Sequence, residues 1–164
     1  MPMTLTGSCR CQAVRFSIAS HTPVPYQLCY CSICRKTAGG GGFAINIMGD
    51  FDTLSIEGRN AIGVYRAELD EGDGTCRTST GERNFCRSCA TALWLWDPSW
   101  PELVHPFASA IDTALPVAAE RTHLMLQYKA EWVVPDIKPG DKSFDVYPDQ
   151  SIEDWHRTRG LWIE

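Results

Sequence analysis

Residues 29–34 read CYCSIC, which places three thiols in one short segment of the chain. Cysteine pairs flank this segment, as Cys9-Arg-Cys11 upstream and as Cys86-Arg-Ser-Cys89 downstream. Thiols in C-x-C and C-x-x-C spacing can point at one ion, and a tetrahedral set of thiolates suits zinc. Because no secretory leader precedes them, we expect reduced thiols that bind metal rather than disulfides. Four thiolates can also hold an iron–sulfur cluster, an alternative that the spacing alone leaves open.

Seven of the eight cysteines fall into two groups by their place in the sequence. The outer group is Cys9, Cys11, Cys86 and Cys89, and the central group is Cys29, Cys31 and Cys34. If the outer group forms one closed zinc site, the central group has three ligands and an open position, which is typical of catalytic zinc. Alternatively, the remaining cysteine, Cys76, closes the central group as well. The outer group would tie the first strand to a distant hairpin, a long loop closure that metal binding can hold.

Alternating apolar residues predict a series of short strands. Val14, Phe16 and Ile18 fall on one face of the segment Cys11–Ile18, which is typical of a strand. Similar segments predict strands at Tyr26–Tyr30, Phe43–Met48, Thr53–Ile56, Ile62–Ala67, Thr75–Thr80, Thr91–Trp96, Val104–Ala110 and Thr122–Tyr128.

Two short helices complete the predicted fold. Ser32–Ala38 can form one helical turn before the glycines at 39–42, which we expect to make a tight turn rather than a phosphate loop. The capping box Ser151-Ile-Glu-Asp154 begins a second short helix that Gly160 ends. No repeat or linker interrupts the chain. We therefore expect one mainly-β, zinc-binding domain over residues 1–164.

Composition narrows the class of protein. The 164 residues are 44% hydrophobic and 21% charged, which is typical of a globular chain. Twenty acidic residues against 15 basic ones give a net charge of -5, which disfavours a nucleic-acid partner. The longest strongly apolar stretch, Ala92–Trp96, is far shorter than a membrane span. With no signal peptide at the N-terminus, we expect a cytoplasmic location and no membrane partner.

The segments that carry the cysteines resemble a known family. They read Gly7-Ser-Cys9-x-Cys11-x2-Val14-x-Phe16, Cys29-x-Cys31-Ser-x-Cys34-Arg-Lys, Gly42-Phe43-Ala44 and Phe85-Cys86-x2-Cys89-Ala90-x2-Leu93. In this order they resemble the glutathione-dependent formaldehyde-activating enzyme family, which includes centromere protein V-like proteins, over roughly residues 4–135. The resemblance implies a twisted, multi-sheet, mostly-β zinc fold.

The resemblance also implies a role for each cysteine group. It implies a structural zinc on the outer group and a catalytic zinc on Cys29, Cys31 and Cys34, so two zinc ions per chain. It further implies that the thiol of glutathione, as co-substrate, approaches the second zinc. We therefore expect a zinc-dependent carbon–sulfur lyase that acts on a glutathione–aldehyde adduct resembling S-hydroxymethylglutathione. The chain departs from the family at Ala90, where glycine is common, and in the segment Trp96–His105.

Glutathione carries two carboxylates, so its site should offer cations. Arg35 and Lys36 follow Cys34 directly and are the first candidates. The other candidates flank the later cysteines and are Arg77, Arg83 and Arg87. Ser32 and His105 are candidates to move a proton, as is a water on the metal. The isolated histidines are expected to be surface or core residues rather than ligands, namely His21, His123 and His156.

Two other functions compete with the lyase. A non-catalytic, zinc-stabilised binding module would have both metal sites closed. A redox protein would use Cys31 and Cys34 as an exchanging pair, but the additional Cys29 favours metal.

Overall fold

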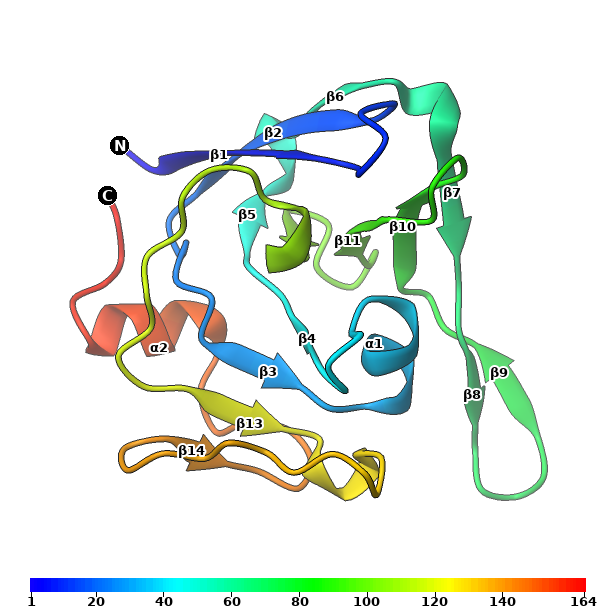
Figure 1. Cartoon of the computed structure of the whole chain (residues 1–164), viewed down its shortest axis with the longest axis vertical. Helices are drawn as coiled ribbons and strands as arrows, with labels where there is room; N and C mark the ends of the chain where they lie inside the picture. Colours follow the sequence, from blue (N-terminus) through cyan, green and yellow to red (C-terminus); the bar gives the residue numbers. More distant parts are fainter.

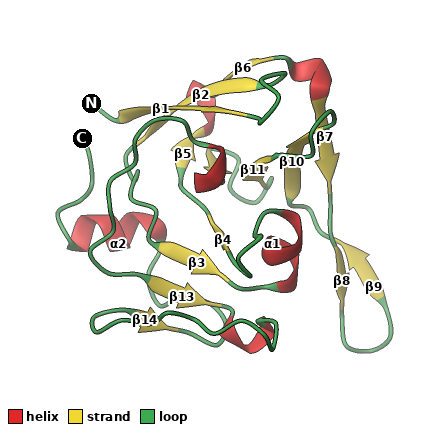
Figure 2. Ribbon diagram, viewed as in Figure 1, coloured by secondary structure: helices red, strands yellow, loops and turns green.

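The strands of the chain form several small sheets rather than one continuous sheet. The computed structural model describes residues 1–164 (Figures 1 and 2). Its strands are β1 (Met3–Ser8), β2 (Arg15–Ser20), β3 (Gln27–Cys29), β4 (Ala44–Ile45), β5 (Gly49–Asp50), β6 (Ser55–Glu57), β7 (Ile62–Tyr65), β8 (Glu68–Asp70), β9 (Cys76–Thr78), β10 (Glu82–Cys86), β11 (Ala92–Trp96), β12 (Leu103–Pro106), β13 (Thr122–Leu124) and β14 (Lys142–Ser143). The helices are α1 (Ser32–Thr37) and α2 (Ile152–Thr158). The predicted mainly-β fold with short helices is confirmed.

Four sheets are present. The three-stranded sheet has the order β1-β2-β6, and the five-stranded sheet has the order β5-β12-β11-β10-β7. The four-stranded sheet has the order β14-β13-β3-β4, in which β13 runs parallel to both β3 and β14. The strands β8 and β9 pair only with each other and project from the body as a hairpin arm (Figure 1). None of the helices is both long and apolar enough to cross a membrane.

The largest core joins the first sheet to the five-stranded sheet. It comprises Leu5, Cys9, Val14, Phe16, Ile18, Ile47, Cys86, Leu93, Trp94, Val104 and Ala110. Phe16 and Trp94 meet edge to face with ring centroids 5.2 Å apart, a favourable geometry for aromatic rings. Because Cys9 and Cys86 are part of this core, the outer cysteine group lies where the two sheets meet.

A smaller core surrounds the central cysteine group. Cys29 and Cys34 pack there with Ala44, Phe107 and Leu124. These residues come from β3, α1, β4, β13 and the segment after β12. The two cysteine groups therefore sit in different hydrophobic cores of the same chain.

Both predicted helices are present, and a side chain caps each of them, of which the sequence predicts the Ser151 cap. The Sγ atom of Cys31 accepts a hydrogen bond from the backbone N–H of Cys34 at the start of α1. The hydroxyl of Ser151 accepts from the N–H of Asp154 at the start of α2. A cap of this kind is worth about 1 kcal/mol.

Several predicted strands are too long. The strand predicted at Cys11–Ile18 begins only at Arg15, because residues 9–14 form a turn in which Gln12 has a φ of 64°. The strand predicted at Thr122–Tyr128 ends at Leu124, since Met125 adopts a left-handed φ of 61° and a 3-10 turn follows. The strand predicted at Val104–Ala110 likewise gives way to a 3-10 turn at Ala108–Ala110.

Candidate functional site

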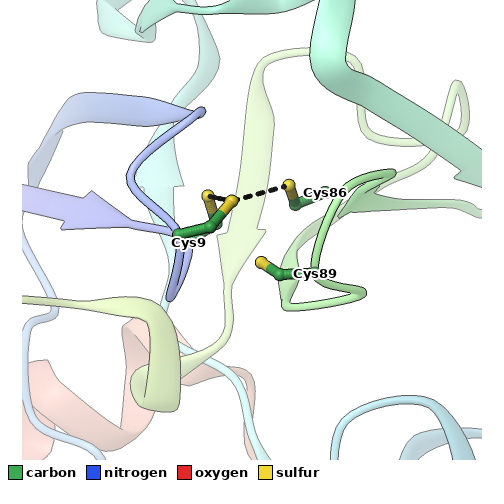
Figure 3. Close-up of side chains that lie close together, drawn as sticks. Cys9, Cys86 and Cys89 are labelled. Carbon is green, nitrogen blue, oxygen red and sulfur yellow. Dashed lines mark hydrogen bonds between the residues drawn. The ribbon is translucent and has the colours of Figure 1, made fainter.

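The four thiols of the outer group converge from two turns. Cys9 and Cys11 lie in the turn between β1 and β2, while Cys86 ends β10 and Cys89 lies in the turn before β11. Figure 3 shows Cys9, Cys86 and Cys89 facing a common centre. All four Sγ atoms lie within 4.8 Å of one another, with 3.5 Å between Cys9 and Cys11 and 3.8 Å between Cys11 and Cys86.

These distances fit a zinc ion. A tetrahedron with zinc–sulfur bonds of about 2.3 Å has sulfur–sulfur edges of about 3.8 Å. The turns also orient the thiols, because the N–H of Val14 donates to the Sγ of Cys9 over 3.3 Å. No disulfide links any of the eight cysteines. The outer group therefore has the donor set and the spacing that a closed zinc site requires.

The central group converges at the junction of β3 and α1. Cys29 ends β3, Cys31 caps α1, and Cys34 lies in the first turn of that helix. Their three Sγ atoms lie within 4.8 Å of one another, and Cys29 and Cys34 are buried. Hydrogen bonds from Cys29 and Cys34 lower the pKa of the Cys31 thiol, while the same contacts and burial raise the pKa of Cys29, so without a metal ion the cluster favours a single thiolate, on Cys31.

No further metal-binding side chain joins the central group. Among the cysteine, histidine, aspartate and glutamate side chains, only these three gather at that place. Cys76, the candidate for a fourth ligand, is exposed on β9 of the hairpin arm. The structure thus groups the thiols as four and three. The three thiols fit a zinc ion that keeps one position free of protein ligands.

A cavity of about 350 Å³ opens beside the central group. It is lined by Thr37, Tyr65, Arg83, Asn84, Phe85, Ala90, Ala92 and Phe107. Phe107 belongs to the core that contains Cys29 and Cys34, and Ala92 packs against that core, so the cavity and the core of the thiols share a wall. The cavity is large enough for a small organic ligand.

Arg83 is the cation of this cavity. Its Nε and Nη1 atoms are buried and have no hydrogen-bond partner within the chain. Its charge also reaches Cys34. Hydrogen bonding with Cys29 lowers the pKa of Cys34, contact with Cys31 and burial together raise it to about 11, and the Arg83 charge opposes that rise. Two buried guanidinium nitrogens without a partner are costly, so the site is suited to an anionic ligand.

Comparisons with known proteins agree with this geometry. The sequence model of the family described as "Glutathione-dependent formaldehyde-activating enzyme" matches residues 4–126. The chain belongs to this family. A Halomonas elongata protein named for the same family is 56% identical over 159 residues, covering 97% of this chain and 98% of that protein. A crystal structure of a Rhodobacter sphaeroides protein shares the fold, with a TM-score of 0.51 and 22% identity over 70% of this chain and 92% of that one.

One departure from the family pattern has a structural cost. Ala90, at the position where the family resemblance leads us to expect glycine, adopts a left-handed φ of 61° in the turn of the outer group. Its N–H donates to the carbonyl oxygen of Cys86 over 2.8 Å, which closes the turn. Glycine adopts this backbone freely, whereas alanine does so at a cost of about 1 kcal/mol.

The other predicted site residues differ in their surroundings. Lys36 is exposed on α1, whereas Arg35 is half-buried and its Nε atom has no partner. Arg77 pairs with Glu71 on the arm, and Arg87 is exposed. Of the cations that the sequence nominates, Arg83 is the one that lines the cavity.

His105 belongs to neither cysteine group. It is on β12 rather than in a loop, and its Nδ1 atom is 3.2 Å from the carbonyl oxygen of Ile47. Its ring meets Trp100 edge to face. Burial lowers the pKa of His105 to about 4, so the ring is neutral near pH 7. These contacts are with the segments that precede β5 and β12, and none is with a cysteine of either group.

The glycine segment after α1 makes the tight turn that the sequence predicts. The N–H of Gly42 donates to the carbonyl oxygen of Gly39 over 3.0 Å. A Cβ atom on Gly39 would lie 2.1 Å from the carbonyl oxygen of Phe43, so only glycine fits there. The close approach is between backbone segments that follow the central cysteine group.

Proposed function

We propose that the chain catalyses the reversible addition of glutathione to formaldehyde at the central cysteine group, with one zinc ion on each group. In the reverse direction the reaction breaks a carbon–sulfur bond, so the enzyme acts as a carbon–sulfur lyase. One observation carries the proposal. Three mutually close thiols, with no fourth metal-binding side chain, share a wall with a cavity that holds an unpartnered guanidinium.

The two groups take different roles in this proposal. The outer group holds a structural zinc that joins two sheets, and the central group holds the catalytic zinc. When bound by three thiolates, zinc supplies a position that favours the deprotonated form of an incoming thiol. In the addition, the sulfur of glutathione forms a bond to the carbon of formaldehyde, and the thiol proton ends on the former carbonyl oxygen. Ser32, exposed directly after Cys31, is our candidate to carry that proton.

The chain's own residues bind the substrate. We assign one glutathione carboxylate to Arg83, because its buried Nε and Nη1 atoms lack partners and the guanidinium fork matches a carboxylate. We assign the other carboxylate to Arg35 and Lys36, which extend from α1 beyond Cys34. Phe107 and Ala92 supply the apolar wall beside the thiols and limit the access of water to them.

We expect Arg83→Gln to weaken substrate binding more than catalysis. A charge-assisted hydrogen bond contributes about 1.5–3 kcal/mol, so KM for the glutathione adduct should rise about tenfold to a hundredfold. The value of kcat should change little, because Arg83 binds a part of the substrate that does not react. Steady-state kinetics provide the measurement. Arg77→Gln, on the exposed arm, is the matched control and should leave KM unchanged.

NMR exchange spectroscopy tests the function itself. Glutathione and formaldehyde exchange with their adduct in solution, and the enzyme should accelerate that exchange. The acceleration should be much smaller with 2-mercaptoethanol, which lacks carboxylates for Arg83. No acceleration of the glutathione exchange over buffer would refute the proposal.

Three other expectations from the sequence remain proposals. We propose a cytoplasmic location, where reducing conditions keep thiol groups free to bind metal. We also propose that residues 1–164 form one zinc-binding domain and that its partner is a small molecule rather than a nucleic acid, given the net charge of -5.

A further inference from the structure

Three buried polar side chains form a hydrogen-bond network behind the central cysteine group. The hydroxyl of Tyr30 lies 2.9 Å from Nδ1 of His123. The Nε2 atom of that histidine lies 3.3 Å from Oδ2 of Asp141. Tyr30 and His123 are each 1% exposed, and the side chain of Asp141 is 4% exposed. Buried polar groups are costly unless each has a hydrogen-bond partner, so a complete network of this kind indicates a specific role.

The hydrogen-bond partners determine where the protons lie in this network. The carboxylate of Asp141 also accepts the backbone N–H of Arg121 over 2.7 Å and that of Lys138 over 2.9 Å. Burial raises the pKa of Asp141, but these two N–H donors and His123 outweigh it and hold the pKa below its usual range. An ionised carboxylate only accepts, so Nε2 of His123 carries a proton, and in the neutral ring Nδ1 then accepts from the Tyr30 hydroxyl. Each polar side-chain atom of Tyr30, His123 and Asp141 then has a hydrogen-bond partner.

One end of this hydrogen-bond network lies inside the C-x-C segment. Tyr30 is the residue between Cys29 and Cys31. Its backbone N–H donates to the carbonyl oxygen of Leu124 over 3.0 Å, and its hydroxyl reaches the neighbouring His123. Both partners lie on β13, which pairs in parallel with β3. The middle of the C-x-C segment is therefore held to β13 at two points.

The surroundings of Tyr30 leave it little freedom. Its ring packs with Leu28 and Val133 and lies 5.4 Å from the ring of Phe43. Apolar packing alone would tolerate small shifts of the ring, whereas a directional hydrogen bond specifies one position. Asp141, which anchors the far end, lies beyond residues 4–126, the part that the family model matches. The protein thus supports the C-x-C segment with a residue from its C-terminal region.

We propose that Tyr30, His123 and Asp141 are positioning residues that hold Cys29 and Cys31 at the separation a metal ion requires. The inference rests on the proposed function, because it assumes that the central group holds zinc. Loss of the Tyr30 hydroxyl would let the C-x-C segment move and would weaken metal binding at the central group. The outer group, in a different core, would be unaffected.

Zinc release tests the proposal with an internal control. Zinc-loaded protein is mixed with a chromogenic chelator, and the release from each site is followed as a separate kinetic phase. The phase that is missing in Cys29→Ser belongs to the central group. In Tyr30→Phe we expect this phase to accelerate about tenfold, the lower end of the effect of residues that orient metal ligands. The phase of the outer group should keep its wild-type rate.

Tyr26→Phe is the matched control. Tyr26 is also buried and immediately precedes β3, but its hydroxyl bonds to Gln27 and its ring stacks on Trp155. It should leave both phases unchanged. Equal acceleration of both phases in Tyr30→Phe, or the same effect in Tyr26→Phe, would show a general loss of stability and overturn the proposal.

A second set of variants guards against misfolding. Asp141→Asn keeps an acceptor oxygen but removes the charge, and it should accelerate the same phase. Combined with Tyr30→Phe, it should add little, because both act through one chain of hydrogen bonds. Additive effects would contradict the proposal. If wild-type protein releases only one zinc ion, the two-site function itself is wrong, and that outcome is visible without any variant.

Discussion

Cys86→Ser is expected to unfold the chain. Cys86 is 0% exposed in the largest core, and with Cys89 it faces the thiols of Cys9 and Cys11 across the junction of two sheets. A structural zinc site contributes about 10–16 kcal/mol of apparent binding free energy. The whole stability of a folded domain is only about 5–15 kcal/mol. Loss of this site should therefore remove the cooperative thermal transition.

Circular dichroism and thermal melting measure this effect. Cys76→Ser is the matched control, since Cys76 is exposed on the arm and belongs to neither group. It should melt at the wild-type temperature. A Cys86→Ser variant that stays folded with a wild-type Tm would remove the structural role from the outer group.

Cys29→Ser is expected to abolish activity while the chain stays folded. The central group lies in a small core, and its three cysteines come from one continuous segment of residues 29–34, whereas the outer group joins two segments that are distant in the sequence. Its loss should therefore lower Tm far less than Cys86→Ser does. Residues that merely orient metal ligands change activity by about 10- to 100-fold, so loss of a ligand should cost at least about 100-fold.

The exchange of formaldehyde between its free form and its glutathione adduct provides the readout. Cys76→Ser again serves as control and should keep the wild-type rate. A Cys29→Ser variant with full activity would place the chemistry elsewhere. A variant that unfolds like Cys86→Ser would give both groups a structural role.

The closely spaced cysteines were predictable as metal ligands because the members of each pair or triple are local in the sequence. C-x-C and C-x-x-C spacing brings each pair together whatever the rest of the fold does. The division into four and three still needed the structure, since only tertiary contacts could place Cys76 on an exposed arm. The start of the second helix was also predictable, because the cap Ser151 lies beside Asp154, to which it bonds. The cap of the first helix by Cys31 was not predicted and was found only in the structure.

The cavity was not predictable, because it depends on strand register. Residues 82–86 read ERNFC and lack a clear apolar alternation, so the strand β10 was missed. It forms because β7 and β11 pair with it on both sides. Arg83 on β10 pairs with Tyr65 on β7, and this register places both side chains in the lining of the cavity. Nothing local distinguishes Arg83 from Arg77 or Arg87.

The hydrogen-bond network of Tyr30, His123 and Asp141 was also not predictable from the sequence. In the sequence, His123 is an isolated histidine, and its partners lie 93 residues upstream and 18 residues downstream. The sequence predicts a surface or core residue, and the structure places His123 in the core. The link to the C-x-C segment arises only because β13 pairs in parallel with β3.

The open position of the central group is the central claim, and a cobalt titration tests it most directly. Zinc is replaced by cobalt, glutathione is added, and the thiolate-to-cobalt absorption band is followed. The account predicts a band that grows and saturates at one glutathione per chain, and that does not grow in Cys29→Ser. A band that stays constant, with two cobalt ions bound per chain, would mean that both sites are closed and would contradict the account.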